Sequence, residues 1–253
     1  MRYQEATSAR RLPQFIWLLL TAILVMASST GAIADSIRAV ETPLDALAST
    51  AAIVEGTIRE NTYTFDPAAG PRTVATLADV TADFGRLDDK TLPLATLGGP
   101  ISEKQELFIP ELPVLTDDTR YLLFLTNADW FFSPVVENYV FRLETDPQRG
   151  TDVLIAPSGR AVVGLSADGL EFSQEPVMDT QIDFISPHAK PRLREGAAAQ
   201  LATAMSKQDF LAAVRDLLKA APLQGEFRSS PTRDRVWNQI TAEAAPLRDA
   251  NPR

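Results

Sequence analysis

The residues that could carry out chemistry are few in this chain and lie far apart. His188 is the only histidine, and it stands in a segment flanked by Pro187 and Pro191. A Ser-His-Asp relay needs a positioned imidazole base, and a catalytic zinc ion usually needs two or three imidazoles. We therefore interpret His188 as a structural or incidental residue.

Two pairs of adjacent aspartates are the main candidates for acid-base chemistry. Asp88-Asp89 and Asp117-Asp118 could supply an acid and a base, as two carboxylates do in glycosidases. Neighbouring side chains on a strand or turn point apart, however, and neither pair lies in an apolar segment that would raise a pKa. We expect solvated turns here. Calcium binding stays a minor alternative, because oxygen ligands are present but a spaced loop with a glycine pivot is not.

A third stretch has a partial match to a catalytic motif. The sequence Gly164-Leu165-Ser166-Ala167-Asp168 nearly matches a nucleophile elbow, but an aspartate stands where the second glycine permits the strained turn. We expect the tip of a β-hairpin instead. The chain has no phosphate loop, no glycine-rich dinucleotide fingerprint and no cysteine, so we expect no cofactor, no metal site and no thiol nucleophile.

The one aromatic cluster is the best lead to a binding surface. Trp130, Phe131 and Phe132 follow one another in the segment from Asp129 to Pro134, where a connection between two strands is expected. Aromatic anchors dominate the binding energy of many interfaces, so the three side chains could form a contact patch. The alternative is that they continue a hydrophobic strand and close one end of the fold.

The first 34 residues have the order of a secretory signal peptide. Arg2, Arg10 and Arg11 precede an apolar run from Phe15 to Ala27, and a small-residue cleavage box ends at Ala34. The run of 13 residues is shorter than the roughly 20 that a membrane-spanning helix needs, which favours a removable leader over a retained anchor. We expect cleavage after Ala34 and a periplasmic or secreted bacterial protein.

Charge limits the partners of the exported chain. The full sequence has 24 basic and 33 acidic residues, and removing the leader's three arginines and one glutamate leaves 21 and 32, a net charge of −11. Such a chain is repelled by phosphate backbones and anionic lipids. We therefore expect no nucleic acid partner and contact with a membrane only during export. With no cysteine, the core must be stable without disulfides.

Periodicity predicts a β-rich region followed by helices. A short helix should begin at Pro43 with Thr42 as its N-cap, and a second, after Ser206, should be the most secure. Alternating or apolar runs predict strands at 53–60, 72–84, 92–97, 120–125, 135–144, 152–156, 161–165 and 170–172, with 61–71 as a loop. A further alanine-rich helix is expected within 194–204.

These elements predict a mainly β fold. We expect a signal peptide at 1–34, a small antiparallel barrel at 35–175, and a linker and helical C-terminal extension at 176–253, with a β-sandwich as the alternative to the barrel.

Several apolar and glycine-containing segments, read in order, resemble those of known proteins. Ala52–Ile58, Tyr121–Leu125, Pro134–Val136, Phe141–Leu143 and Gly159–Val162 are similar to segments of uncharacterised exported bacterial proteins with an OB-like barrel, a class that includes netrin-type inhibitor modules. The resemblance implies that fold and carries over no catalytic residue. Inhibitors of that class chelate a protease zinc through an N-terminal cysteine, whereas the expected mature N-terminus here is Asp35.

The function that the sequence favours is binding. We predict an exported, non-catalytic barrel that binds an envelope protein or extracellular ligand through loops at one rim, with Trp130, Phe131 and Phe132 as contacts. Two alternatives stay open: a hydrolase that acts on envelope polymers through two carboxylates, and a purely structural envelope component.

Overall fold

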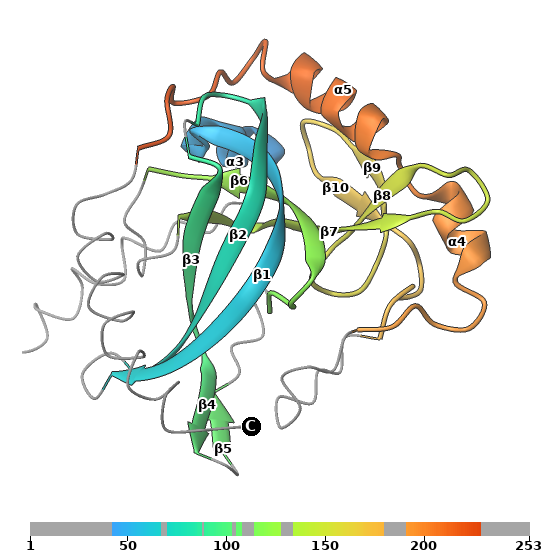
Figure 1. Ribbon diagram of the computed structural model, residues 1–253. Helices are drawn as coiled ribbons and strands as arrows, with labels where there is room; N and C mark the ends of the chain where they lie inside the picture. Colours follow the sequence, from blue (N-terminus) through green and yellow to red (C-terminus); the bar gives the residue numbers. More distant parts are fainter. Residues whose placement is uncertain are drawn as a thin grey trace, which may run out of the picture. The chain divides into compact units, whose positions relative to one another are not determined.

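The computed structural model describes residues 42–66, 70–87, 89–102, 105–107, 114–127, 134–179 and 191–228. Within these ranges the fold is mainly β, with one six-stranded antiparallel sheet in the order β3-β2-β1-β6-β7-β8 (Figure 1). The strands are β1 (Ala52–Asp66), β2 (Gly70–Phe84), β3 (Thr91–Leu97), β6 (Thr119–Leu125), β7 (Val135–Thr145) and β8 (Asp152–Ile155).

The first two strands are the longest, and they form one continuous hairpin. β1 and β2 each have 15 residues and pair as far as Asp66 opposite Gly70, so the predicted loop at 61–71 is wrong over most of its length. Polar residues there did not break the strand. Gly56 lets the pair approach closely, because a Cβ at this position would lie 2.7 Å from Cγ of Leu77.

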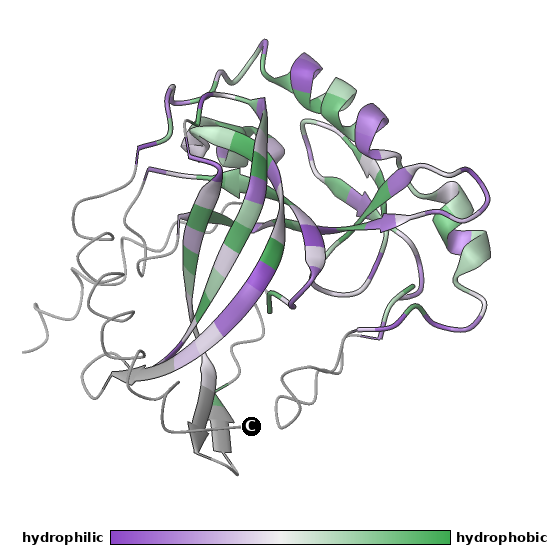
Figure 2. Cartoon of the chain, in the orientation of Figure 1, coloured by the Kyte–Doolittle hydropathy of each residue, from purple (hydrophilic) through white to green (hydrophobic). Residues whose placement is uncertain are grey.

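The sheet has a hydrophobic core on each face. We call them the inner core, which includes Val54, Leu77, Leu94, Tyr121 and Leu123, and the outer core, which includes Ile53, Leu122, Phe124, Phe141 and Phe210. Figure 2 shows hydrophobic and hydrophilic residues interspersed along β2, whereas β1 is hydrophobic toward one end and hydrophilic toward the other. As predicted, β6 is central and buried on both faces, because its consecutive side chains enter different cores.

The predicted closed barrel is wrong for the part of the chain that the structure describes. The sheet is open: β3 and β8 end the strand order and do not pair with each other. Closure is not needed to bury the apolar residues, because the outer face is covered by other elements. Alternation along a strand shows which residues share a face, but it does not show which strand lies next to which.

Two residues with positive φ change the alternation. Asp79 (φ 56°) lies in β2 and Asn138 (φ 63°) in β7, and the strand register shifts beside Asn138. Val135 and Val140 therefore both contact the inner core although they are five residues apart. The simple alternation predicted for residues 135–144 does not hold across this bulge, where asparagine tolerates the left-handed conformation.

Two helices cover the outer core. α3 (Pro43–Ser49) begins as predicted, with the Thr42 side chain accepting a hydrogen bond from the Asp45 amide. α5 (Lys207–Leu217) also begins as predicted, with Ser206 accepting from the Asp209 amide. Phe210 and Val214 of α5 are fully buried against the sheet. α5 is therefore an integral part of the outer core.

The remaining strands form two separate two-stranded sheets. β9 (Val162–Leu165) and β10 (Leu170–Phe172) form a hairpin, and β4 (Gly99–Ser102) and β5 (Gln105–Leu107) form another. β8 packs with α4 (Ala198–Thr203) in a third, smaller core. Arg149, in the turn between β7 and β8, connects that turn to α4. It pairs with the solvent-inaccessible Asp146 and donates hydrogen bonds to the carbonyls of Leu201 and Ala204 at the end of α4.

Some predictions lie outside the described residues. These are the signal peptide with its cleavage site at Ala34 and the segment around His188. Among the residues that are described, no helix combines the length and apolar character needed to cross a bilayer.

Candidate functional site

The end of the sheet where β6 passes to β7 carries the candidate binding surface. The amide of Thr126 donates a hydrogen bond to the Pro134 carbonyl over 2.7 Å, which closes the base of the connection. Both flanking strands are buried in the two cores. Trp130, Phe131 and Phe132, the predicted contact residues, belong to this connection and lie outside the described residues. The two flanking strands, β6 and β7, therefore fix Thr126 and Pro134, which lie on either side of this connection.

The chain's own C-terminal segment meets the same end of the sheet. We call residues 224–228 the tail segment. Figure 1 shows it, in red, leaving α5 and running past the ends of β2 and β3. Asn127 donates from Nδ2 to the Glu226 carbonyl (3.0 Å) and accepts from the Arg228 amide (2.8 Å). The Phe227 amide donates to the Arg86 carbonyl (3.2 Å), and its side chain is only 6% exposed in the inner core. Sequence analysis did not identify this contact.

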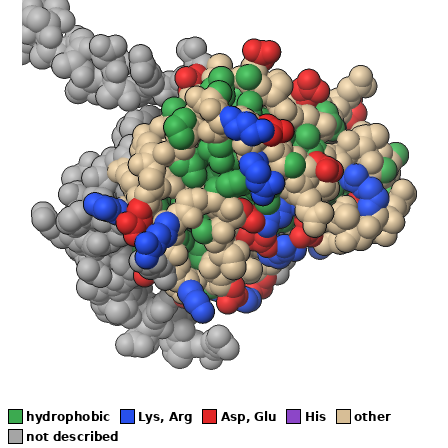
Figure 3. Space-filling model, turned by 90° about the horizontal axis from the view of Figure 1, so that it is seen from above, with side chains coloured by type: hydrophobic (Ala, Val, Ile, Leu, Met, Phe, Trp, Pro, Cys, Tyr) green, Lys and Arg blue, Asp and Glu red, His purple; other side chains and the backbone are tan. Residues whose placement is uncertain are grey.

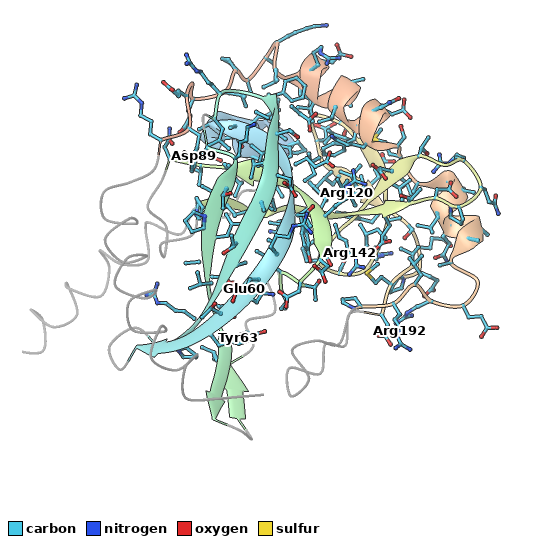
Figure 4. The ribbon with its side chains drawn as sticks, in the orientation of Figure 1. Glu60, Tyr63, Asp89, Arg120, Arg142 and Arg192 are labelled. Carbon is cyan, nitrogen blue, oxygen red and sulfur yellow. The ribbon has the colours of Figure 1, made fainter. Side chains whose placement is uncertain are left out.

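A second candidate is an ion-pair cluster at the edge of the outer core, which we call the Arg120 cluster (Figure 4). Arg120 Nη2 lies 2.5 Å from Glu55 Oε1 and 2.7 Å from Asp152 Oδ2. Lys207, the first residue of α5, bonds the other oxygen of Glu55 and lies 3.0 Å from Asp83 Oδ2. The five residues come from β6, β1, β8, α5 and β2, so the cluster fastens α5 to the sheet.

Electrostatics favour the ionised forms of Glu55 and Asp152 in this cluster. Burial alone would raise the pKa of Glu55, but hydrogen bonds from Lys207 and Arg120 outweigh it and lower the pKa below its ordinary value. The Arg120 hydrogen bond likewise lowers the pKa of Asp152. Burial opposes the charge of Lys207, yet hydrogen bonds to Glu55 and Asp83 raise its pKa. A general acid needs the opposite, a carboxyl held protonated near neutral pH, so the cluster is suited to holding elements together.

The other predicted candidates do not form a catalytic centre among the described residues. Asp118 and Asp89 are exposed, and Asp117 and Asp118 form a turn before β6. Ser166 lies at the tip of the β9–β10 hairpin, where its amide donates to the Gly169 carbonyl, so the prediction of a hairpin tip is confirmed. In the described part of the chain, no three His, Cys, Asp or Glu residues form a group that could hold a metal ion.

The Arg120 cluster left only a weak trace in the sequence. Glu55 lies on the side of β1 that also carries Ile53, and Arg120 is the second residue of β6, the most apolar strand. A charged residue at a position that alternation predicts to be buried is the signal that could have pointed to them. Their pairing with Lys207, 152 residues from Glu55, depends on tertiary structure alone.

Comparison with protein-family models, with curated proteins and with solved structures found no match to this chain. The site is therefore interpreted from its own geometry.

Proposed function

We propose that this protein is an exported, non-catalytic binding protein of the bacterial periplasm or extracellular space. Its partner would be an envelope protein or an extracellular ligand, bound through the β6–β7 connection with Trp130, Phe131 and Phe132 as contacts. The leader pattern at 1–34 and the resemblance of several segments to exported bacterial proteins support the compartment.

The observation that carries the proposal is the anchoring of this connection. The Thr126–Pro134 hydrogen bond joins the ends of two core strands, so three consecutive aromatic residues are carried on a rigid base. Rigid scaffolds that present loops are a common basis for binding, and aromatic residues lose little conformational entropy on contact. Hydrogen bonds from Arg120 and Lys207 lower the pKa of Glu55, and Arg120 lowers that of Asp152, so neither supplies the protonated general acid that the two-carboxylate hydrolase alternative needs.

Capture from the envelope fraction of the source bacterium tests the proposal. Tagged mature protein is compared with a variant in which Trp130, Phe131 and Phe132 are all alanine, and captured proteins are quantified by mass spectrometry. We expect a partner that the triple variant loses. The matched control is Phe172→Ala combined with Leu193→Ala, which removes two exposed apolar side chains elsewhere and should leave capture unchanged.

Circular dichroism and thermal melting must show that both variants fold like the original chain. Equal recovery of every captured protein by the original and the triple variant would refute the proposed contact.

A further inference from the structure

The tail segment contacts a site that we call the slot, formed by Arg86, Leu87, Asn127 and Val135. It lies there in the way that an extended peptide lies on a recognition domain. Phe227 is the anchor, buried to 6% exposure beside the partly buried Leu87 and Val135. Hydrogen bonds hold the tail backbone at the anchor and on both sides of it. The Arg86 carbonyl accepts from the Phe227 amide, while the Asn127 side chain donates to the Glu226 carbonyl and accepts from the Arg228 amide. Backbone hydrogen bonds combined with one aromatic pocket are the elements of recognition by strand addition.

The contacts around this anchor are shallow. The side chains of Arg86 and Arg228 are 72% and 80% exposed, and their distances to Glu226 carboxylate oxygens are 3.9 and 3.8 Å. Exposed pairs of this kind contribute little to stability. Gly225, with φ 109°, has no atom within 4 Å of the position that a Cβ would take. The tail segment is thus held by one buried side chain and by hydrogen bonds to Arg86, Asn127 and, from the Gln224 amide over 2.8 Å, the Thr50 carbonyl, while Gln224, Glu226 and Arg228 are exposed.

Charged groups of both signs surround the slot. Arg86 lies beside Glu226, and Glu226 lies beside Arg228, so an acidic, an aromatic and a basic residue follow one another in the segment. Figure 3, which views the molecule from above, shows hydrophobic side chains among acidic and basic ones on that face. The slot therefore presents the Arg86 cation to an acidic residue at its rim and an apolar site to an aromatic residue at its centre.

We propose that this slot is a peptide-binding site that the chain's own tail occupies in the free protein. Its ligand is an extended segment of a partner protein in which an acidic residue comes directly before an aromatic residue. The partner segment displaces residues 224–228 and takes over their hydrogen bonds to Arg86 and Asn127. The inference goes beyond the proposed function, because it does not use residues 128–133 and either proposal can fail without the other.

A labelled synthetic peptide tests the site directly. The peptide has the sequence of residues 222–229, and its binding to the full chain and to Phe227→Ala is measured by fluorescence anisotropy. A tethered segment competes at an effective concentration that reaches the millimolar range. We therefore expect the variant, whose slot is vacant, to bind the peptide at least tenfold more tightly than the original chain does.

Two controls define the contact. A peptide with alanine in place of its phenylalanine should bind neither protein. Adding Asn127→Ala to Phe227→Ala should weaken peptide binding about tenfold, because the two hydrogen bonds of the Asn127 side chain to the peptide backbone are lost. If folded Phe227→Ala does not bind the peptide, the proposal is wrong. Concentration-dependent dimers of the original chain held by exchanged tails would also overturn it, since the slot would then serve self-association.

Hydrogen exchange on the unaltered chain gives a second test that does not depend on how the variant folds. The amides of Phe227 and Arg228 donate to Arg86 and Asn127, so their exchange reports release of the tail. We expect them to exchange at least a hundredfold faster than the amide of Leu123 in β6, through local opening. If all three amides exchange at the same rate, the tail leaves only on global unfolding and the proposal fails.

Discussion

Glu55→Gln tests whether the Arg120 cluster fastens α5 to the sheet. The Glu55 side chain is 18% exposed and accepts hydrogen bonds from both Arg120 and Lys207. Breaking a fully buried pair costs about 3–5 kcal/mol, whereas an exposed pair is worth about 0.2–1 kcal/mol. Glu55 lies between these limits, and each cation keeps a second carboxylate. We therefore expect a loss of about 1–3 kcal/mol in the free energy of unfolding at pH 7.

Urea denaturation at several pH values is the assay. Glu55 and Asp152 have pKa values lowered from ordinary values of 4.5 and 3.8, so their folded forms bind protons less readily than their unfolded forms. Their stabilisation is complete above the ordinary values and is lost as the pH falls through the lowered ones. The difference between the original chain and Glu55→Gln should therefore be largest near neutral pH and shrink below pH 4.5.

A matched control uses another ion pair of β1. Arg59 and Asp79 lie 2.7 Å apart, but their side chains are 55% and 69% exposed. Arg59→Gln should therefore cost no more than about 0.5 kcal/mol. The reasoning is refuted if Glu55→Gln costs as little as this control at pH 7, or if its effect grows as the solution becomes more acidic.

Three further changes probe the fold. Phe210→Ala, which removes a fully buried ring 5.3 Å from that of Phe141, should cost about 3–5 kcal/mol in urea denaturation, and a loss below 1 kcal/mol would mean that α5 is not part of the core. Gly56→Ala should cost about 1–3 kcal/mol by thermal melting, because its Cβ would clash with Leu77; an unchanged melting temperature would contradict the close approach. Arg149→Gln should lower the melting temperature and speed hydrogen exchange in α4, and unchanged α4 exchange would show that the contact is dispensable.

Local signals predicted most element types and starts. The N-caps Thr42 and Ser206 begin α3 and α5 because each side chain satisfies an amide three residues ahead, an interaction contained within one turn. The apolar run from Arg120 to Leu125 correctly indicated a central strand. Such features depend on neighbours in sequence, and the sequence contains all the information that they need.

Long-range pairing could not be obtained in the same way. The open sheet depends on β7 continuing to β8 and on α3 and α5 covering the outer face, whereas alternation alone was compatible with a barrel. The bulge at Asn138 moves two valines of β7 to one core, which no regular period predicts. The loop predicted at 61–71 became strand because β1 and β2 pair with each other there.

The candidate sites divide along the same line. By itself, the sequence determined the aromatic composition of residues 130–132, the order of basic and apolar residues in 1–34 and the lack of cysteine, since these are properties of the chain before folding. Only the tertiary structure brought Arg120 to Glu55 and Lys207, and Phe227 into the inner core. The physical reason is that a buried charge or ring is stabilised by whichever groups surround it in space, and those groups come from distant strands and helices.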